Sequence, residues 1–208
     1  MKRLGALLLI LALLPNPLWA ASYKSSVRQL MLDGSPYCTA VAITAEGDRD
    51  SSLFLTAAHC FAPGQTIDGH PVEYLLYNRE LDLMLVRTDG YSVPSLGLGR
   101  EVKEGDRVLW AGYPRETNAE YTQYWSTVKR THQDLSYVLG AWQDVNYVEF
   151  DVPHGMLNGN SGGASIKDGR LVGIVVAQFF NAEPEDPTKP VIHGAFVSRA
   201  AIELFLGL

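Results

Sequence analysis

A histidine, a carboxylate and a serine each stand in a setting that suits nucleophilic catalysis. His59 follows a short apolar stretch, Asp82 is the one acid of the apolar run Leu81–Val86, and Ser161 lies in the glycine-rich stretch Asn158–Gly163. An imidazole can act as general base toward a serine hydroxyl, and the serine can then attack an acyl carbon. The three residues therefore predict acyl-transfer chemistry, provided that the fold brings them together.

The glycines around Ser161 indicate how negative charge on a substrate oxygen would be stabilised. Glycine adopts positive φ and allows another backbone to approach closely. The amides of Gly159 and Ser161 are therefore predicted to point together at a developing oxyanion, where one such donor contributes roughly 10²- to 10³-fold in rate. Taken alone, the stretch fits an ordinary glycine-rich hairpin equally well.

The acid at position 82 needs a partner if it is buried. A carboxylate in apolar surroundings costs free energy unless it is paired. The predicted partner is the proton-bearing ring nitrogen of His59, which Asp82 would hold in the useful tautomer. The alternative is an acid at a strand end that faces water.

Short β-rich runs separated by Gly, Asp, Asn and Pro follow Ala20, a pattern typical of an all-β protein. The predicted strands are 27–32, 37–44, 52–56, 71–77 and 81–87 in a first half, then 107–112, 123–131, 146–152, 164–166, 170–177 and 191–197 in a second. The Ser/Pro/Gly-rich stretch 92–100 is predicted to link the halves. The stretch 181–190 has three prolines and three acids and is predicted to be an exposed loop. Ser198 is predicted to cap a helix that packs against a barrel.

The N-terminus predicts export. Residues 1–20 combine a cationic start, the unbroken apolar run Leu4–Leu14 and a small residue, Ala20, which is typical of a secretory signal peptide. A permanent membrane anchor is the alternative, but it needs about 20 apolar residues. We therefore expect a mature chain of residues 21–208, secreted or periplasmic, with no membrane attachment. In such an oxidising compartment Cys38 and Cys60 are expected to pair, the alternative being two buried thiols.

Charge excludes one class of partner. The chain has 17 basic and 23 acidic residues, and removal of residues 1–20 takes away two of the cations, so the formal charge falls from −6 to 15 − 23 = −8. A basic patch for nucleic acid is therefore not expected.

Together with the stretches 105–108 and 111–114, the three motifs identify a family. They occur in the chain order His, Asp, Ser, and the sequence resembles the trypsin-like serine proteases of the chymotrypsin fold, more closely their compact bacterial members. The resemblance implies a secreted serine endopeptidase that works through an acyl-enzyme, with two six-stranded antiparallel β-barrels and the triad in the cleft between them. His59 and Asp82 would come from a barrel of about residues 21–95, Ser161 from one of about 100–197, and a helix would span 198–207. The resemblance also implies that a Cys38–Cys60 bridge lies behind the histidine.

The sequence departs from the family at the residue before the nucleophile. Relatives that are activated by cleavage pair an Asp there with a new N-terminus of the Ile-Val-Gly-Gly type, whereas this chain has Asn160 and no such stretch. We therefore predict activity that does not depend on that ion pair.

The resemblance implies a pocket for the primary side chain of the substrate. Its base falls on Gly155, and its walls fall on Val175–Gln178 and Ile192–Ala195, so Gln178 and His193 are candidate substrate-binding residues. These residues are mainly apolar or small and predict a small or apolar primary side chain. Histidines recognise acidic side chains in the glutamyl endopeptidases, which this chain also resembles in size, so His154 and His193 leave an acidic preference as the alternative.

Two other functions use the same residues. The fold could be a binding module with vestigial chemistry, although an intact triad argues against it, or it could be a serine esterase, although the chain lacks the Gly-x-Ser-x-Gly elbow of the α/β-hydrolases. A zinc site of His59, Asp82 and His154 is not supported by any tight His or Cys spacing. We expect no cofactor or metal, a polypeptide substrate and a monomer. The aromatic stretch 121–142 is expected to line core and cleft, and His70 and His132 to lie at the surface.

Overall fold

The computed structural model describes residues 23–44, 49–115, 119–137, 140–151, 158–182 and 190–208, without the side chains of 135–137, 140–142, 179–182 and 190–192. The predicted signal peptide, Gly155 and His154 lie outside these residues. The described chain forms two closed six-stranded antiparallel barrels and a C-terminal helix, as the resemblance implied.

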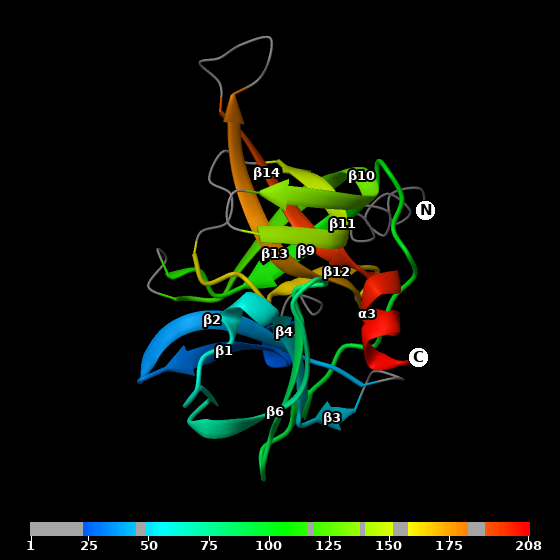
Figure 1. Ribbon diagram of the computed structural model, residues 1–208. Helices are drawn as coiled ribbons and strands as arrows, with labels where there is room; N and C mark the ends of the chain where they lie inside the picture. The colour runs from blue at the N-terminus through cyan, green and yellow to red at the C-terminus, as the bar shows by residue number, and fades with distance from the viewer. Residues whose placement is uncertain (1–22, 45–48, 116–118, 138–139, 152–157, 183–189) are drawn as a thin grey trace, which may run out of the picture.

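The N-terminal strands close the first barrel, the lower one in Figure 1. Its strand order is β1-β2-β4-β7-β6-β5. The strands are β1 (Val27–Leu32), β2 (Ser35–Ala42), β4 (Leu53–Ala57), β5 (Thr66–Ile67), β6 (His70–Asn78) and β7 (Leu83–Thr88). The 3-10 helix η1 (Ala58–Cys60) follows β4 directly.

The remaining long strands close the second barrel, in the order β10-β11-β14-β13-β12-β9. They are β9 (Arg107–Gly112), β10 (Thr122–Tyr137), β11 (Gly140–Phe150), β12 (Ala164–Lys167), β13 (Arg170–Ala182) and β14 (Pro190–Ser198). In Figure 1 the β13–β14 hairpin projects beyond this barrel.

One prediction about loops is wrong. Strand pairing continues from Ala177↔Ala195 to Ala182↔Pro190, so both ends of the stretch predicted as an exposed loop belong to β13 and β14. The stretch 92–100 lies between the last strand of barrel one and the first strand of barrel two, where a link was predicted, and it contains the short strand β8 (Val93–Pro94), which pairs with β3 (Asp50–Ser51). In both places proline lies at a strand position where a missing N–H is tolerated, so its presence did not exclude a strand.

Alternate residues of the barrel-two strands face two different cores. On β9, Val108 and Trp110 pack inside barrel two, whereas Leu109 and Ala111 belong to the cluster shared with barrel one. Because both faces are buried, the strand is a continuous apolar run rather than an alternating one. The shared cluster makes the contact between the barrels apolar, and this contact holds the two halves of the candidate site in place.

The predicted C-terminal helix is confirmed as α3 (Arg199–Leu206). The Ser198 hydroxyl accepts a hydrogen bond from Ala201 N, so Ser198 is the N-cap. The helix packs against β13 and β14 with Ile202 fully buried. No helix among the described residues combines the length and apolarity needed to cross a membrane.

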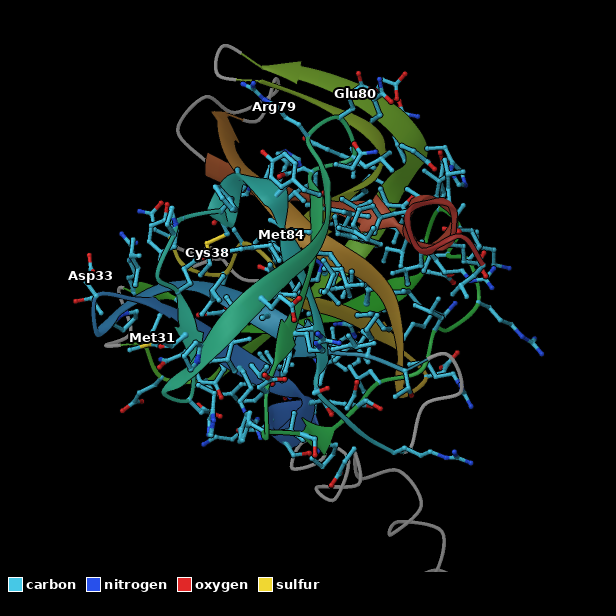
Figure 2. All side chains as sticks on the ribbon, turned by 60° about the horizontal axis from the view of Figure 1, so that its bottom comes forward. Met31, Asp33, Cys38, Arg79, Glu80 and Met84 are labelled. Atoms are coloured by element: carbon cyan, nitrogen blue, oxygen red, sulfur yellow. A yellow bond between two sulfur atoms is a disulfide. The ribbon has the colours of Figure 1, made fainter. Side chains whose placement is uncertain are left out.

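The two cysteines form one disulfide. Cys38 of β2 is bonded to Cys60 of η1, with Cα atoms 6.2 Å apart and a sequence separation of 22 residues. The bond appears in yellow near the Cys38 label in Figure 2. It ties the strand that faces barrel two to the short helix that carries His59.

Replacing both cysteines by serine (Cys38→Ser with Cys60→Ser) should lower the free energy of unfolding by about 3 kcal/mol, since a closed loop of this length restricts the unfolded chain. For a domain of this size the loss corresponds to a Tm lower by roughly 6–12 °C. Scanning calorimetry of the two proteins, with the reduced wild type as control, measures it. An unchanged Tm would show that the bridge does not contribute to stability.

Candidate active site

The strand topology brings His59 and Asp82 together. Strands β4 and β7 are antiparallel neighbours with Ala57 opposite Leu83, so the end of β4 meets the start of β7. His59 lies just after the first strand and Asp82 just before the second. The apolar run predicted that Asp82 lies within a strand, and this is wrong. Asp82 occupies the turn before β7, with φ +52°.

Asp82 holds His59 by both its backbone and its ring. One carboxylate oxygen accepts the His59 amide at 2.8 Å and the other lies 2.6 Å from His59 Nδ1. The Asp82 side chain is 5% exposed and that of His59 is 44% exposed. A buried carboxylate accepts but does not donate, so it holds the proton on Nδ1 and leaves Nε2 free to take a proton from a nucleophile.

The Ser161 turn is fastened to both barrels. Within barrel two, Gly162 N donates to Val175 O at 2.8 Å, and Val175 N donates to Gly163 O at 2.9 Å. From barrel one, Thr39 N donates to Ser161 O at 2.9 Å. The nucleophile candidate is thus held at the seam between the barrels by hydrogen bonds of its own peptide and its neighbours.

The disulfide places this turn beside the histidine. Cys60, the residue after His59, has its Sγ atom 3.8 Å from the Ser161 carbonyl oxygen. Within the described residues, the His59 ring and the Ser161 hydroxyl do not hydrogen-bond to each other, although both remain accessible. Such a bond often tightens only when substrate binds, so the arrangement suits a base and nucleophile in the unliganded state.

Two glycines of the turn are required by space and by dihedral angle. Gly159 has φ +98° and Gly162 has φ +83°. A Cβ atom at Gly162 would lie 2.0 Å from Thr39 O and 2.1 Å from Thr56 Oγ1, both atoms of barrel one. The close approach of the two barrels at this point therefore needs glycine.

The carbonyl of Gly159 is also held by barrel one. Thr39 Oγ1 donates to Gly159 O at 2.8 Å. The amides of Gly159 and Ser161 make no hydrogen bond to any other described residue. They are therefore available as donors for a substrate oxygen.

Asn160 is buried under the turn. The residue is 2% exposed, and neither atom of its side-chain amide has a hydrogen-bond partner among the described residues. A Cβ atom at Gly112 would lie 2.3 Å from Asn160 Oδ1, so the amide fits closely against β9. A neutral amide can occupy this place at a lower desolvation cost than a carboxylate.

Of the candidate pocket residues, Gln178 and His193 are described and Gly155 is not. A Cβ atom at Gly194 would clash with Trp110 in the core of barrel two, so the side chain of His193 lies on the opposite face of β14. There it stacks on Tyr147 at 5.0 Å between ring centroids. Desolvation lowers the pKa of His193, although the nearby Glu149 acts in the opposite direction. The lowered pKa keeps the ring neutral at pH 7.

Several residues expected to be uninvolved lie away from this seam. His70 stacks on Tyr91 at 4.5 Å, and His132 Nδ1 lies 2.6 Å from Asp144 Oδ1. The described residues contain no group of three or more His, Cys, Asp or Glu side chains placed to hold a metal. Thr39, by contrast, was missed, because a threonine in a strand carries no local signal of a contact 120 residues away.

Solved structures share the fold at low sequence identity. The Rv3671c protease of M. tuberculosis in an inactive form is 21% identical with a TM-score of 0.68, and the match covers 94% of each chain. The HtrA-type protease AlgW with a decapeptide is 20% identical with a TM-score of 0.64, covering 91% of this chain and 66% of AlgW. The MamO protease domain of Magnetospirillum magneticum is 14% identical with a TM-score of 0.61, covering 88% and 96%.

Comparison with curated proteins gives no significant match. The family comparison is decisive, because residues 38–174, well over half of the chain and including His59, Asp82 and Ser161, match the trypsin-like peptidase domain. This chain belongs to the trypsin-like peptidase family.

Proposed function

We propose that this protein is a secreted serine endopeptidase with His59, Asp82 and Ser161 as its catalytic triad. Ser161 Oγ attacks the carbonyl carbon of a peptide bond while His59 Nε2 takes the hydroxyl proton. The imidazolium returns that proton to the leaving amine, which leaves an acyl-enzyme on Ser161. Water, deprotonated by His59, then attacks the ester and releases the acid and the free serine.

The observation that carries the proposal is the paired attachment of Asp82 to His59. The two bonds of 2.8 and 2.6 Å hold both the backbone and the ring of the histidine, which remains partly exposed. A purely structural ion pair would not require an accessible ring nitrogen, nor a nearby glycine turn in which two amides bond to no other described residue. Those amides, of Gly159 and Ser161, would bind the oxyanion.

Export is proposed from the disulfide and the N-terminal sequence. The Cys38–Cys60 bridge persists in an oxidising compartment, so it supports a secreted or periplasmic location. Residues 1–20 would be removed as a signal peptide.

Replacement of the nucleophile (Ser161→Ala) should abolish both labelling by a fluorophosphonate probe and casein digestion. The fold should be retained, since Thr39 is bonded to the peptide of residue 161 and not to its side chain.

In the same assays Asp82→Asn should lower kcat by about 10⁴-fold, because the amide favours the wrong tautomer of His59. Casein digestion by Ser161→Ala would refute the assignment. Labelling without digestion in the wild type would favour a small-ester esterase, and neither activity in a folded wild type would favour a binding module.

The primary specificity pocket is proposed to accept small or apolar side chains. A neutral His193 stacked on Tyr147 offers no cation to an acidic side chain. Cleavage of a peptide library at pH 7, with fragments identified by mass spectrometry, should therefore occur mainly after small or apolar residues. Cleavage confined to sites after Glu and Asp, or after Lys and Arg, would contradict this.

Activity is proposed not to depend on a liberated N-terminal ammonium group. The buried side chain at position 160 is a neutral amide, so it does not require a cation to compensate it. A protein with extra residues before Ala21, so that the natural N-terminus is blocked, should digest casein at a rate within twofold of the mature form. A stable inactive precursor that cleavage near Ala21 converts to an active enzyme would contradict the proposal.

A further inference from the structure

The side chain of Arg115 lies beside the candidate oxyanion donors. Its backbone amide donates to Asn158 O at 2.7 Å, which anchors the residue to the start of the Ser161 turn. A Cβ atom at Gly159 would lie 3.1 Å from Arg115 Cγ, so the arginine stem packs directly on that glycine. Arg115 itself is exposed. A cation is therefore held at the edge of the place where a substrate carbonyl would react.

The guanidinium group is held in position by Tyr37. It lies over the Tyr37 ring, with Cζ 5.3 Å from the ring centroid, and Nη2 is 3.4 Å from Tyr37 O. Among the described residues, Arg115 forms no ion pair with a carboxylate. Stacking restricts the rotamers of the side chain, and a planar guanidinium fixed in this way is suited to bidentate binding of a carboxylate.

The position of Tyr37 shows which part of a substrate would meet this cation. Cys38, its neighbour, is bonded to Cys60, the residue after His59. In the proposed mechanism His59 gives its proton to the leaving amine. The chain that follows the scissile bond therefore leaves the site on the side of His59 and the disulfide, toward Tyr37.

The geometry of strand β2 indicates which residue of the substrate would meet Arg115. Tyr37 precedes Thr39 by two residues, and Thr39 contacts both Ser161 and Gly159. Two residues of extended chain span about 7 Å and bring side chains back to the same face. Tyr37 also has no partner in β1, because the register passes from Leu30↔Cys38 to Met31↔Pro36. A substrate that runs extended beside this strand covers the same distance in two residues, so the residue that would meet Arg115 is the second one after the scissile bond.

We propose that Arg115, stacked on Tyr37, binds the carboxylate of an Asp or Glu side chain at the second position after the scissile bond. This inference rests on the proposed function for the direction of the substrate. It is not a consequence of net charge, because the chain carries 23 acidic and 17 basic residues and so repels acidic peptides overall. The preference must come from the local cation.

Two measurements test the proposal with one peptide series. The peptides share one sequence with a small or apolar residue before the intended scissile bond, end in a carboxamide, and differ only in having Glu, Gln or Lys at the second position after that bond. Fluorescence anisotropy gives the affinity of the peptides for the Ser161→Ala variant, a measurement that requires no turnover. Quenched-fluorescence assays give kcat/KM for the wild-type enzyme. The Glu peptide should exceed the Gln peptide about fivefold in each, as a partly exposed ion pair permits, and Lys should be weakest.

Variants assign the effect to one residue. In Arg115→Gln the Glu/Gln ratio should fall to about one, and in Arg115→Lys part of it should return. The matched control Arg100→Gln removes an arginine that lines a different surface hollow, with Lys103 and Asp106, and should keep the ratio. Equal affinities of the Glu and Gln peptides for Ser161→Ala, or a ratio that survives in Arg115→Gln, would overturn the proposal. Absence of cleavage by the Ser161 enzyme would instead contradict the proposed function, since the binding arm tests Arg115 without it.

Discussion

Thr39 connects the two barrels at the point where the candidate site is assembled. Its backbone amide and hydroxyl donate to Ser161 O and Gly159 O of barrel two, while its own carbonyl accepts the Thr56 hydroxyl at 2.7 Å within barrel one. The residue is fully buried, so each of these bonds also satisfies a polar group that would otherwise be costly to bury. The turn can approach this closely because position 162 has no side chain. These contacts thus hold the two barrels together at the nucleophile candidate.

A second constraint acts within barrel one. The buried carboxylate of Asp82 must be paired, and the groups that pair with it belong to the residue that would act as base. The same two contacts therefore compensate the acid for its burial and orient the histidine. The apolar strands β4 and β7 make it rigid, because their register places the two residues at the same barrel end.

Sequence reasoning located most strands but was least accurate where pairing extends beyond a barrel. Strands β1 and β9 were predicted with their observed bounds, since their apolar residues stand between clear turn signals. The β13–β14 hairpin was predicted too short, because the prolines and acids near its tip are typical of loops. Asp82 was assigned to a strand because its neighbours are apolar, whereas hydrogen bonding to His59 holds it in a turn with positive φ. In each case a contact with another strand or residue outweighed the local preference.

The sequence by itself determined the all-β class, the family, the candidate His, Asp and Ser residues and the helix cap at Ser198. All of these depend on residue types and spacings along short stretches of chain. Only the tertiary structure decided that Thr39 holds the nucleophile turn, that His193 stacks on Tyr147, and that Arg115 lies over Tyr37 beside Gly159. Tyr37 and Arg115 are 78 positions apart, and Thr39 and Gly159 are 120 apart. Contacts at such separations are set by the packing of one barrel on the other, which no local pattern of residues encodes.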